Sequence, residues 1–176
     1  MVPPGGIRGG RPKMRGGSNP RQAAKSSTSE QTPDPGAVRA PEKKRVLFVC
    51  VGNSCRSQMA EGFARAYGHD VIVPQSAGLT PAAIVAPLTR VVLAERHIRI
   101  PDQFPKGLDE VLGEMFDIVI NMSGVKLAAQ EGSAANVIDW PVLDPIGQKE
   151  AVYRSVAEEI ERRVMGLILE IRSAPK

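Results

Sequence analysis

The fold is decided by one stretch of the sequence, Val46-Leu47-Phe48-Val49-Cys50-Val51-Gly52-Asn53-Ser54-Cys55-Arg56-Ser57. Its first six residues are apolar and uncharged, which is typical of a strand buried on both faces of a parallel sheet. Gly52 and Asn53, two residue types that readily adopt positive φ, end this run. A helical pattern then continues from Ser57 to Tyr67. The stretch therefore predicts a strand, a tight loop and a helix, an arrangement that directs backbone N–H groups at an anion.

A cysteine at the end of this strand and an arginine six residues later suit oxyanion chemistry. Only the thiolate of a cysteine is a good nucleophile, and N–H donors at a helix N-terminus stabilise a thiolate. The same donors can hold a tetrahedral oxyanion, and a planar guanidinium can bind two of its oxygens. Cys50 and Arg56 are therefore the candidate nucleophile and the candidate oxyanion ligand. The alternative is an inert core cysteine with a surface arginine, which the surrounding strand, loop and helix disfavour.

The rest of the chain alternates between strand and helix patterns. Further strands are predicted over residues 70–75, 116–122 and 136–139, and helices over residues 87–96, 108–115 and 149–172. Such alternation favours parallel strands with right-handed crossovers. We therefore expect a three-layer α/β fold, with a four-stranded parallel sheet, helices on both faces and a phosphate-binding loop after the first strand. Ligands bind such sheets at the carboxyl ends of the strands, where the Cys50 loop is placed.

The first 41 residues differ in composition from the rest of the chain. They contain seven Pro, seven Gly and no aromatic residue, and they carry seven basic and two acidic side chains. Such a segment cannot bury enough apolar surface to order itself. We therefore expect a disordered basic tail over residues 1–41 and one domain over residues 42–176. The basic residues are not clustered or interleaved with aromatics, so a solvated extension is favoured over a nucleic-acid-binding arm.

No part of the sequence has the apolar core of a signal peptide or the length of apolar chain needed to span a membrane. The two cysteines, both in the loop, provide no disulfide framework and fit a reducing compartment. A cytoplasmic protein without a membrane partner is the expectation. His69 and His97 are isolated and pair with the cysteines at no metal-ligand spacing, so no metal site and no cofactor are expected.

The run from Cys50 to Ser57 resembles the phosphate loop of the low-molecular-weight protein tyrosine phosphatases and of their relatives, the thioredoxin-coupled arsenate reductases. The resemblance extends from about Arg45 to the C-terminus. Its second and third landmarks are Ser76-Ala77-Gly78 and Asp144-Pro145. The resemblance implies an enzyme that attacks an oxyanion through Cys50, with Arg56 binding the oxyanion.

The resemblance also implies roles for residues around the nucleophile. Asp144 would be the general acid that protonates the leaving oxygen, although Asp-Pro is also an ordinary turn sequence. Ser57 would hydrogen-bond the Cys50 sulfur, cap the helix, or do both. Asn53 would brace the loop against Ser76. Cys55 would form a protective disulfide with the nucleophile or remain an inert thiol. Oxyanion binding and loop support are assigned to Val51, Gly52, Asn53, Ser54, Cys55, Ser57 and Ser76.

Two chemistries remain open. Ser54 and the run from Gln58 to Gly62 look more like the reductases, but the coupled reductases carry two further cysteines where this chain has Met122-Ser123-Gly124. The phosphatases place aromatic residues after Asp-Pro, where this chain has Ile146-Gly147. The primary expectation is a cysteine-dependent phosphatase acting on a phosphorylated protein or a small phosphoester. The alternatives are an arsenate reductase with an external thiol, or with Cys55 as the resolving thiol, and a non-catalytic oxyanion-binding regulator.

Overall fold

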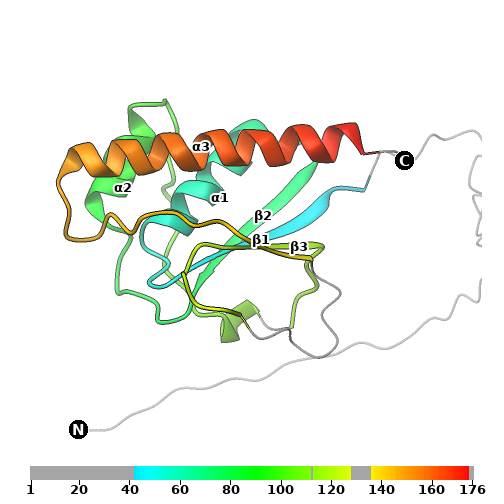
Figure 1. The fold of residues 1–176 in the computed structure, drawn as a ribbon, viewed down its shortest axis with the longest axis horizontal. Helices are drawn as coiled ribbons and strands as arrows, with labels where there is room; N and C mark the ends of the chain where they lie inside the picture. The colour runs from blue at the N-terminus through cyan, green and yellow to red at the C-terminus, as the bar shows by residue number, and fades with distance from the viewer. Residues whose placement is uncertain (1–41, 112, 128–135, 175–176) are drawn as a thin grey trace, which may run out of the picture. The chain divides into compact units, whose positions relative to one another are not determined.

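The structure, a computed structural model, describes residues 42–111, 113–127 and 136–174. The predicted tail, residues 1–41, lies outside the described residues. The elements follow in the order β1 (Lys44–Cys50), α1 (Arg56–Tyr67), β2 (Ile72–Gly78), α2 (Pro87–Ala94), the 3-10 helix η1 (Asp109–Val111), β3 (Ile118–Asn121), β4 (Asn136–Asp139) and α3 (Glu150–Ser173) (Figure 1). None of the helices in these ranges is long and apolar enough to cross a membrane.

The four strands form one all-parallel sheet with the order β2-β1-β3-β4. β1 therefore lies between β2 and β3, and the chain crosses over it when it passes from one to the other. The carboxyl end of β1 is the point where strand order reverses, which is where parallel sheets bind ligands. The predicted α/β fold with a four-stranded parallel sheet is confirmed.

The side chains of β1 alternate between two hydrophobic clusters, one on each face of the sheet. Val46, Phe48 and Cys50 belong to the larger cluster, which also contains residues of α1, α2 and α3. Leu47 and Val49 belong to the smaller cluster. Both sets are almost completely buried, which explains why this strand is apolar at every position from Val46 to Cys50.

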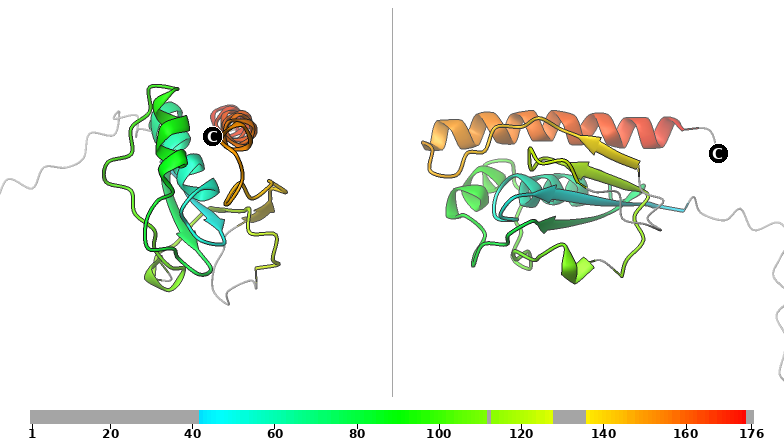
Figure 2. Two further views of the ribbon diagram at one scale, coloured as in Figure 1. Left: turned by 90° about the vertical axis from the view of Figure 1, so that its left-hand side faces the viewer. Right: turned by 60° about the horizontal axis from the view of Figure 1, so that its bottom comes forward.

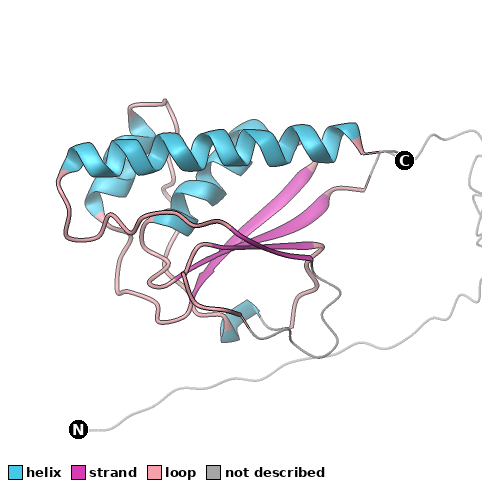
Figure 3. Ribbon diagram, in the orientation of Figure 1, coloured by secondary structure: helices cyan, strands magenta, loops and turns pink. Residues whose placement is uncertain are grey.

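The three α-helices cover the same face of the sheet. Figure 2 shows α3 running along this face, and Figure 3 shows that the opposite face carries the short helix η1. There Val111 and Phe116 pack on Leu47 and Val49. The second helical layer therefore consists of a 3-10 turn, where a longer helix over residues 108–115 was predicted.

Other boundaries also differ from the sequence prediction. β2 begins at Ile72 and runs to Gly78, instead of ending at Gln75. Its extra length comes from pairing with β1, because Ser76, Ala77 and Gly78 lie opposite Phe48, Val49 and Cys50 in register. α2 ends at Ala94, before the predicted Arg96, and β3 covers only residues 118–121 of the predicted 116–122. The longer β2 brings Ser76 and Gly78 up to the loop that follows β1.

Candidate functional site

The backbone carbonyls of the Cys50 loop are held by the segment that follows β2. Four amides of residues 79–86 donate hydrogen bonds of 2.9–3.1 Å to the carbonyl oxygens of Cys50, Val51, Gly52 and Ser54. Among the described residues, by contrast, no acceptor receives a hydrogen bond from the amides of residues 51–56. These amides precede or begin α1, so the loop presents free N–H donors at a helix N-terminus. This is the geometry of an anion-binding loop.

Asn53 fixes the shape of the loop from within. Its backbone has φ of +44°, a left-handed conformation that asparagine tolerates. Its side-chain amide donates to Ser57 Oγ at 2.8 Å and to Ser76 Oγ at 2.9 Å. Its Oδ1 accepts from Gln58 Nε2 at 3.1 Å and from the Lys106 amide at 2.8 Å. The bracing contact predicted between Asn53 and Ser76 is thus present in the structure.

Gly78 lets β2 approach the loop closely. A Cβ atom built at this position would lie 2.8 Å from the Asn53 nitrogen and 2.8 Å from the Val51 oxygen. These are backbone atoms, so neither could move without displacing the loop. Two residues of the Ser76-Ala77-Gly78 landmark therefore have a structural role. Ser76 provides a hydroxyl partner for Asn53, and Gly78 leaves room for the loop because it has no side chain.

Ser57 lies against Cys50, the candidate nucleophile. Its Oγ is 3.0 Å from Cys50 Sγ, and both side chains are buried. Because Ser57 Oγ already accepts a hydrogen bond from Asn53 Nδ2, its own proton is available to the sulfur. The Asn53 amide thus sets the direction of the contact, and Ser57 can donate to a Cys50 thiolate.

Glu61 belongs to the same network, although sequence reasoning did not single it out. Its carboxylate accepts from Ser76 Oγ at 2.6 Å and is only 2% exposed. Arg65 pairs with it at 2.7 Å, and Lys106 Nζ lies 3.9 Å away. With the Ser76 proton committed to Glu61, Ser76 Oγ is left to accept from Asn53. The available signal was the i,i+4 spacing of Ser57 and Glu61, which places both on one face of α1.

Arg56 is buried and reaches across the end of the sheet. Its Nη1 donates to the carbonyl of Met122 at 2.6 Å and more weakly to that of Val142 at 3.3 Å. Its Nη2 forms an ion pair with Asp144. Its Nε is buried without a hydrogen-bond partner among the described residues. The two predicted charged residues, Arg56 and Asp144, are therefore brought together, and the Nε–H of the guanidinium is still available.

Asp144 lies in the loop between β4 and α3. Its Oδ2 contacts Arg56, and its Oδ1 accepts from the Ile146 amide at 3.2 Å. The side chain is 44% exposed, so it contacts solvent as well as Arg56. The structure thus places Asp144 at the rim of the loop, with an Asx-type contact that also fits the ordinary turn interpretation.

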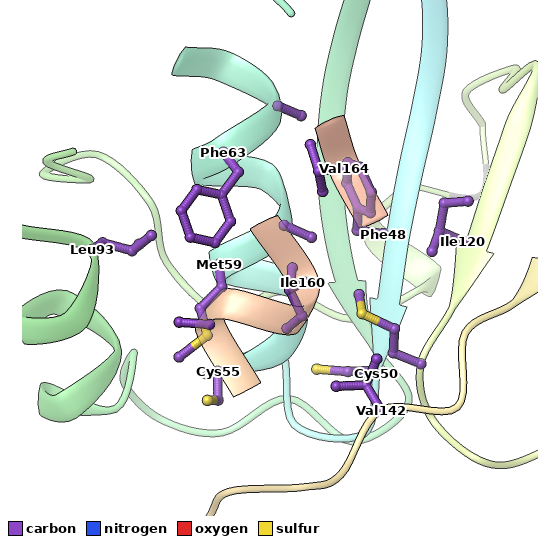
Figure 4. Packing of buried hydrophobic residues seen from close by; sticks show 14 of the residues in the cluster. Phe48, Cys50, Cys55, Met59, Phe63, Leu93, Ile120, Val142, Ile160 and Val164 are labelled. Atoms are coloured by element: carbon purple, nitrogen blue, oxygen red, sulfur yellow. The ribbon is translucent and has the colours of Figure 1, made fainter. Parts of the chain in front are cut away.

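The two cysteines have different surroundings (Figure 4). Cys50 lies at the end of β1 beside Val142, and Cys55 lies at the start of α1 near Met59. Both are buried free thiols. Burial raises the pKa of the Cys55 thiol to about 12, although a hydrogen bond with Thr89 opposes part of this effect. Cys55 is therefore a poor nucleophile in this conformation.

The two histidines and the tryptophan lie outside this network. His69 and His97 are both exposed, and Trp140 is buried against Phe48 with ring centroids 6.2 Å apart. In the described ranges no three His, Cys, Asp or Glu side chains form a metal-binding group. The candidate chemistry therefore rests on Cys50, the loop amides and Arg56.

Comparison with known proteins agrees with this geometry. The family model described as low molecular weight phosphotyrosine protein phosphatase matches residues 45–175. A glutaredoxin arsenate reductase from Synechocystis sp. is 37% identical over 130 residues, covering 73% of this chain and 98% of the relative. Arsenate reductase 1 from Bacillus cereus is 34% identical over 124 residues, covering 69% and 92%.

A solved structure, described as an arsenate reductase in the phosphate binding state, aligns with a TM-score of 0.66 at 35% identity. The alignment covers 73% of this chain and 98% of that one. The residues that the family model matches, 45–175, include the loop, β2 and the Asp144 segment. The chain belongs to the low molecular weight phosphotyrosine protein phosphatase family, and it is similar to arsenate reductases within it.

Proposed function

We propose that this chain is an arsenate reductase that uses an external thiol. The main support is its similarity to proteins named arsenate reductases, which extends over almost the whole length of those relatives. The site is compatible with this activity, because loop amides at a helix N-terminus can hold a tetrahedral oxyanion above Cys50. The primary sequence expectation, a phosphatase, is therefore replaced by the reductase that was its alternative.

The first step would be attack of the Cys50 thiolate on arsenic. One arsenate hydroxyl takes up a proton and leaves as water, and a sulfur–arsenic(V) bond forms. The hydrogen bond from Ser57 stabilises the thiolate before attack, and the loop amides with Arg56 Nε–H bind the oxyanion. Arsenic is not reduced in this step, so further electrons are needed.

The second step would use a thiol from outside the chain. An external thiolate attacks the Cys50 sulfur, the sulfur–arsenic electron pair passes to arsenic, and arsenite leaves. A disulfide between Cys50 and the external thiol remains, and a second thiol regenerates Cys50. The chain has two cysteines in total, and the raised pKa of about 12 makes Cys55 unsuitable as the attacking thiol.

Phosphoester hydrolysis is the second candidate, favoured by the position of Asp144 at the rim of the loop. A phosphate ester needs a proton for its leaving alkoxide or phenoxide, and a carboxyl group must be protonated to donate one. In this structure Asp144 is ion-paired with Arg56. Departure of the arsenate hydroxyl as water needs a proton as well.

The test is a comparison of the two activities on the purified full chain. We expect arsenite to form from arsenate when glutathione, with or without glutaredoxin, is supplied, and p-nitrophenyl phosphate to be hydrolysed slowly. Rapid ester hydrolysis without any thiol-dependent arsenite formation would show that the chain is a phosphatase and would contradict the proposed reductase. In that case Asp144→Asn should slow phenyl phosphate far more than p-nitrophenyl phosphate, since the poorer leaving group depends more on the acid.

A further inference from the structure

We propose that Asn121, at the end of β3, is a positioning residue that aims the Arg56 guanidinium at the bound oxyanion. Arg56 Nη1 donates to the carbonyl of Met122 at 2.6 Å, so the direction of this carbonyl helps to set where the guanidinium points. Asn121 holds the turn from which the carbonyl projects. The inference rests on the proposed function in one respect, namely that Arg56 binds an oxyanion in the loop after β1.

The Met122 carbonyl lies just where the pairing of β3 with β1 stops. The Met122 amide donates to the Val49 carbonyl at 2.7 Å, which continues this pairing by one residue. In a regular parallel ladder, the Met122 carbonyl would next accept from the Val51 amide. β1 has ended at that point, and Arg56 Nη1 takes the place of the amide as donor. The sheet therefore fixes Met122 from one side only, and the turn that follows must fix the other side.

This turn is closed around the side chain of Asn121. Its Oδ1 accepts from the Ser123 amide at 3.0 Å and from Ser123 Oγ at 2.7 Å. Its Nδ2 donates to the Val125 carbonyl at 2.8 Å and to Asp139 Oδ1 at 2.7 Å. The backbone donor on one side and the carboxylate acceptor on the other allow a single orientation of the amide. Asn121 is only 3% exposed, so water does not readily replace these partners.

Asp139 connects the turn to the neighbouring strand. It is the last residue of β4 and lies opposite Asn121 in register. A carboxylate acceptor makes a stronger hydrogen bond than a neutral acceptor does. Because Asp139 is exposed, its charge remains hydrated and little desolvation opposes the contact. The end of β4 thus holds the Asn121 amide in the orientation that closes the turn.

Asn121 acts on the site from the opposite face of the sheet. It lies opposite Val49 in register, and Val49 belongs to the hydrophobic cluster on the η1 face. Cys50 belongs to the larger cluster on the other face. The Asn121 side chain therefore does not contact an oxyanion above Cys50. Its influence passes through the Met122 carbonyl to Arg56, which makes it a positioning residue.

The experiment exchanges the two hydrogen-bond partners in the full chain. Asn121→Asp keeps the size of the side chain and the acceptor for the turn, but it places a second carboxylate against Asp139. The double variant Asn121→Asp/Asp139→Asn restores a donor opposite a carboxylate, with the direction reversed. Asn136→Asp is the matched control, because it makes the same change at an exposed residue at the other end of β4. The readouts are the dissociation constant of inorganic phosphate, measured by calorimetry, and KM and kcat for arsenate.

We expect the phosphate dissociation constant to rise at least ~10-fold in Asn121→Asp, because a misdirected guanidinium loses a hydrogen bond to a charged group. The KM for arsenate should rise with it. The double variant should return to within about threefold of the wild type, as coupled neighbours do. Asn136→Asp should bind phosphate like the wild type. A purely structural role for Asn121 would lower the thermal midpoint and leave the phosphate dissociation constant of the folded protein unchanged.

Thermal midpoints identify a variant that does not fold. If Asn121→Asp is such a variant, Asp139→Ala replaces it, because removing an exposed side chain opens no cavity, and it should also weaken phosphate binding. Wild-type phosphate affinity in the folded variant, no recovery in the double variant, or a wild type that does not bind phosphate overturns the inference. If phosphate binding follows the expected pattern but no arsenite forms, the proposed function fails and the inference stands.

Discussion

Arg56 shows how one side chain can serve two purposes at the residue scale. Two of its nitrogens hold Met122 and Asp144 from other segments, and its Nε is buried with no partner in the part of the chain that the structure describes. A buried donor without an acceptor is costly, so an oxyanion that accepts from Nε would complete the hydrogen bonding of the site. The guanidinium can serve both purposes because it presents several N–H donors in a rigid planar fork.

Replacement of Arg56 by lysine tests whether oxyanion binding depends on the positive charge alone or also on the planar shape of the guanidinium. Lysine keeps the positive charge but cannot bind the oxyanion, Met122 and Asp144 together. We expect kcat/KM for arsenate to fall on the order of 10²-fold or more, as when one oxyanion donor is removed. Steady-state kinetics with a thermal-shift control would test this. Near-normal kinetics would mean that Arg56 is only a structural link between segments.

Cys55 leads to a prediction about stability and pH. The pKa of its thiol is raised by burial from 9.0 to about 12 in the folded protein. Above pH 9 the unfolded chain therefore loses this proton while the folded protein keeps it, so stability is lost as the pH rises from 9 towards 12. Between pH 8 and pH 10 the loss from this group is on the order of 1 kcal/mol.

Urea denaturation of the wild type and of Cys55→Ala at the two pH values measures this loss. The fall in unfolding free energy should be smaller in Cys55→Ala by about that amount. An equal fall in both proteins would show that Cys55 titrates at its ordinary pKa in the fold.

At the scale of elements, the site depends on how closely β2 approaches the loop after β1. Gly78→Ala would place a Cβ atom 2.8 Å from two backbone atoms of the loop. We expect a destabilisation of about 1–3 kcal/mol, as for other overpacked sites, together with reduced arsenate turnover. Gly166→Ala is the control, because nothing lies within 4 Å of a Cβ built there and alanine favours the helix. Equal stability of both variants with wild-type turnover would contradict this account of the loop.

The elements also show what the sequence could predict. The apolar run Val46–Val51 was sufficient for β1, because burial on both faces leaves a local signature. The end of β2 was not predictable, because Gln75, Ser76 and Gly78 have no strand preference and pair only because β1 lies beside them. Cys50, Arg56 and Asn53 were predicted from the loop motif, and Ser76 from the second landmark of the family resemblance. Glu61 and Gln58 were missed, since polar helix residues are normally solvated and their burial depends on distant partners.

At the scale of the whole molecule, the hydrogen bonds of the site that the structure describes join residues from β1 onward. We therefore expect a chain that lacks residues 1–41 to keep its thermal midpoint and its turnover with arsenate. Scanning calorimetry and steady-state kinetics on the full and shortened chains would compare them. A large loss of either property in the shortened chain would show that the first 41 residues contribute to the domain.

The central claim is that Cys50 reduces arsenate with a thiol from outside the chain. The most direct measurement is arsenite production from arsenate and glutaredoxin by the full chain, by Cys50→Ser and by Cys55→Ala. The account predicts that Cys50→Ser makes no arsenite, because the attacking sulfur is gone. It predicts turnover within about threefold of the wild type for Cys55→Ala, because Cys55 is a buried thiol outside the reaction. Loss of arsenite production in Cys55→Ala while its fold is intact, or production that persists in Cys50→Ser, would contradict it.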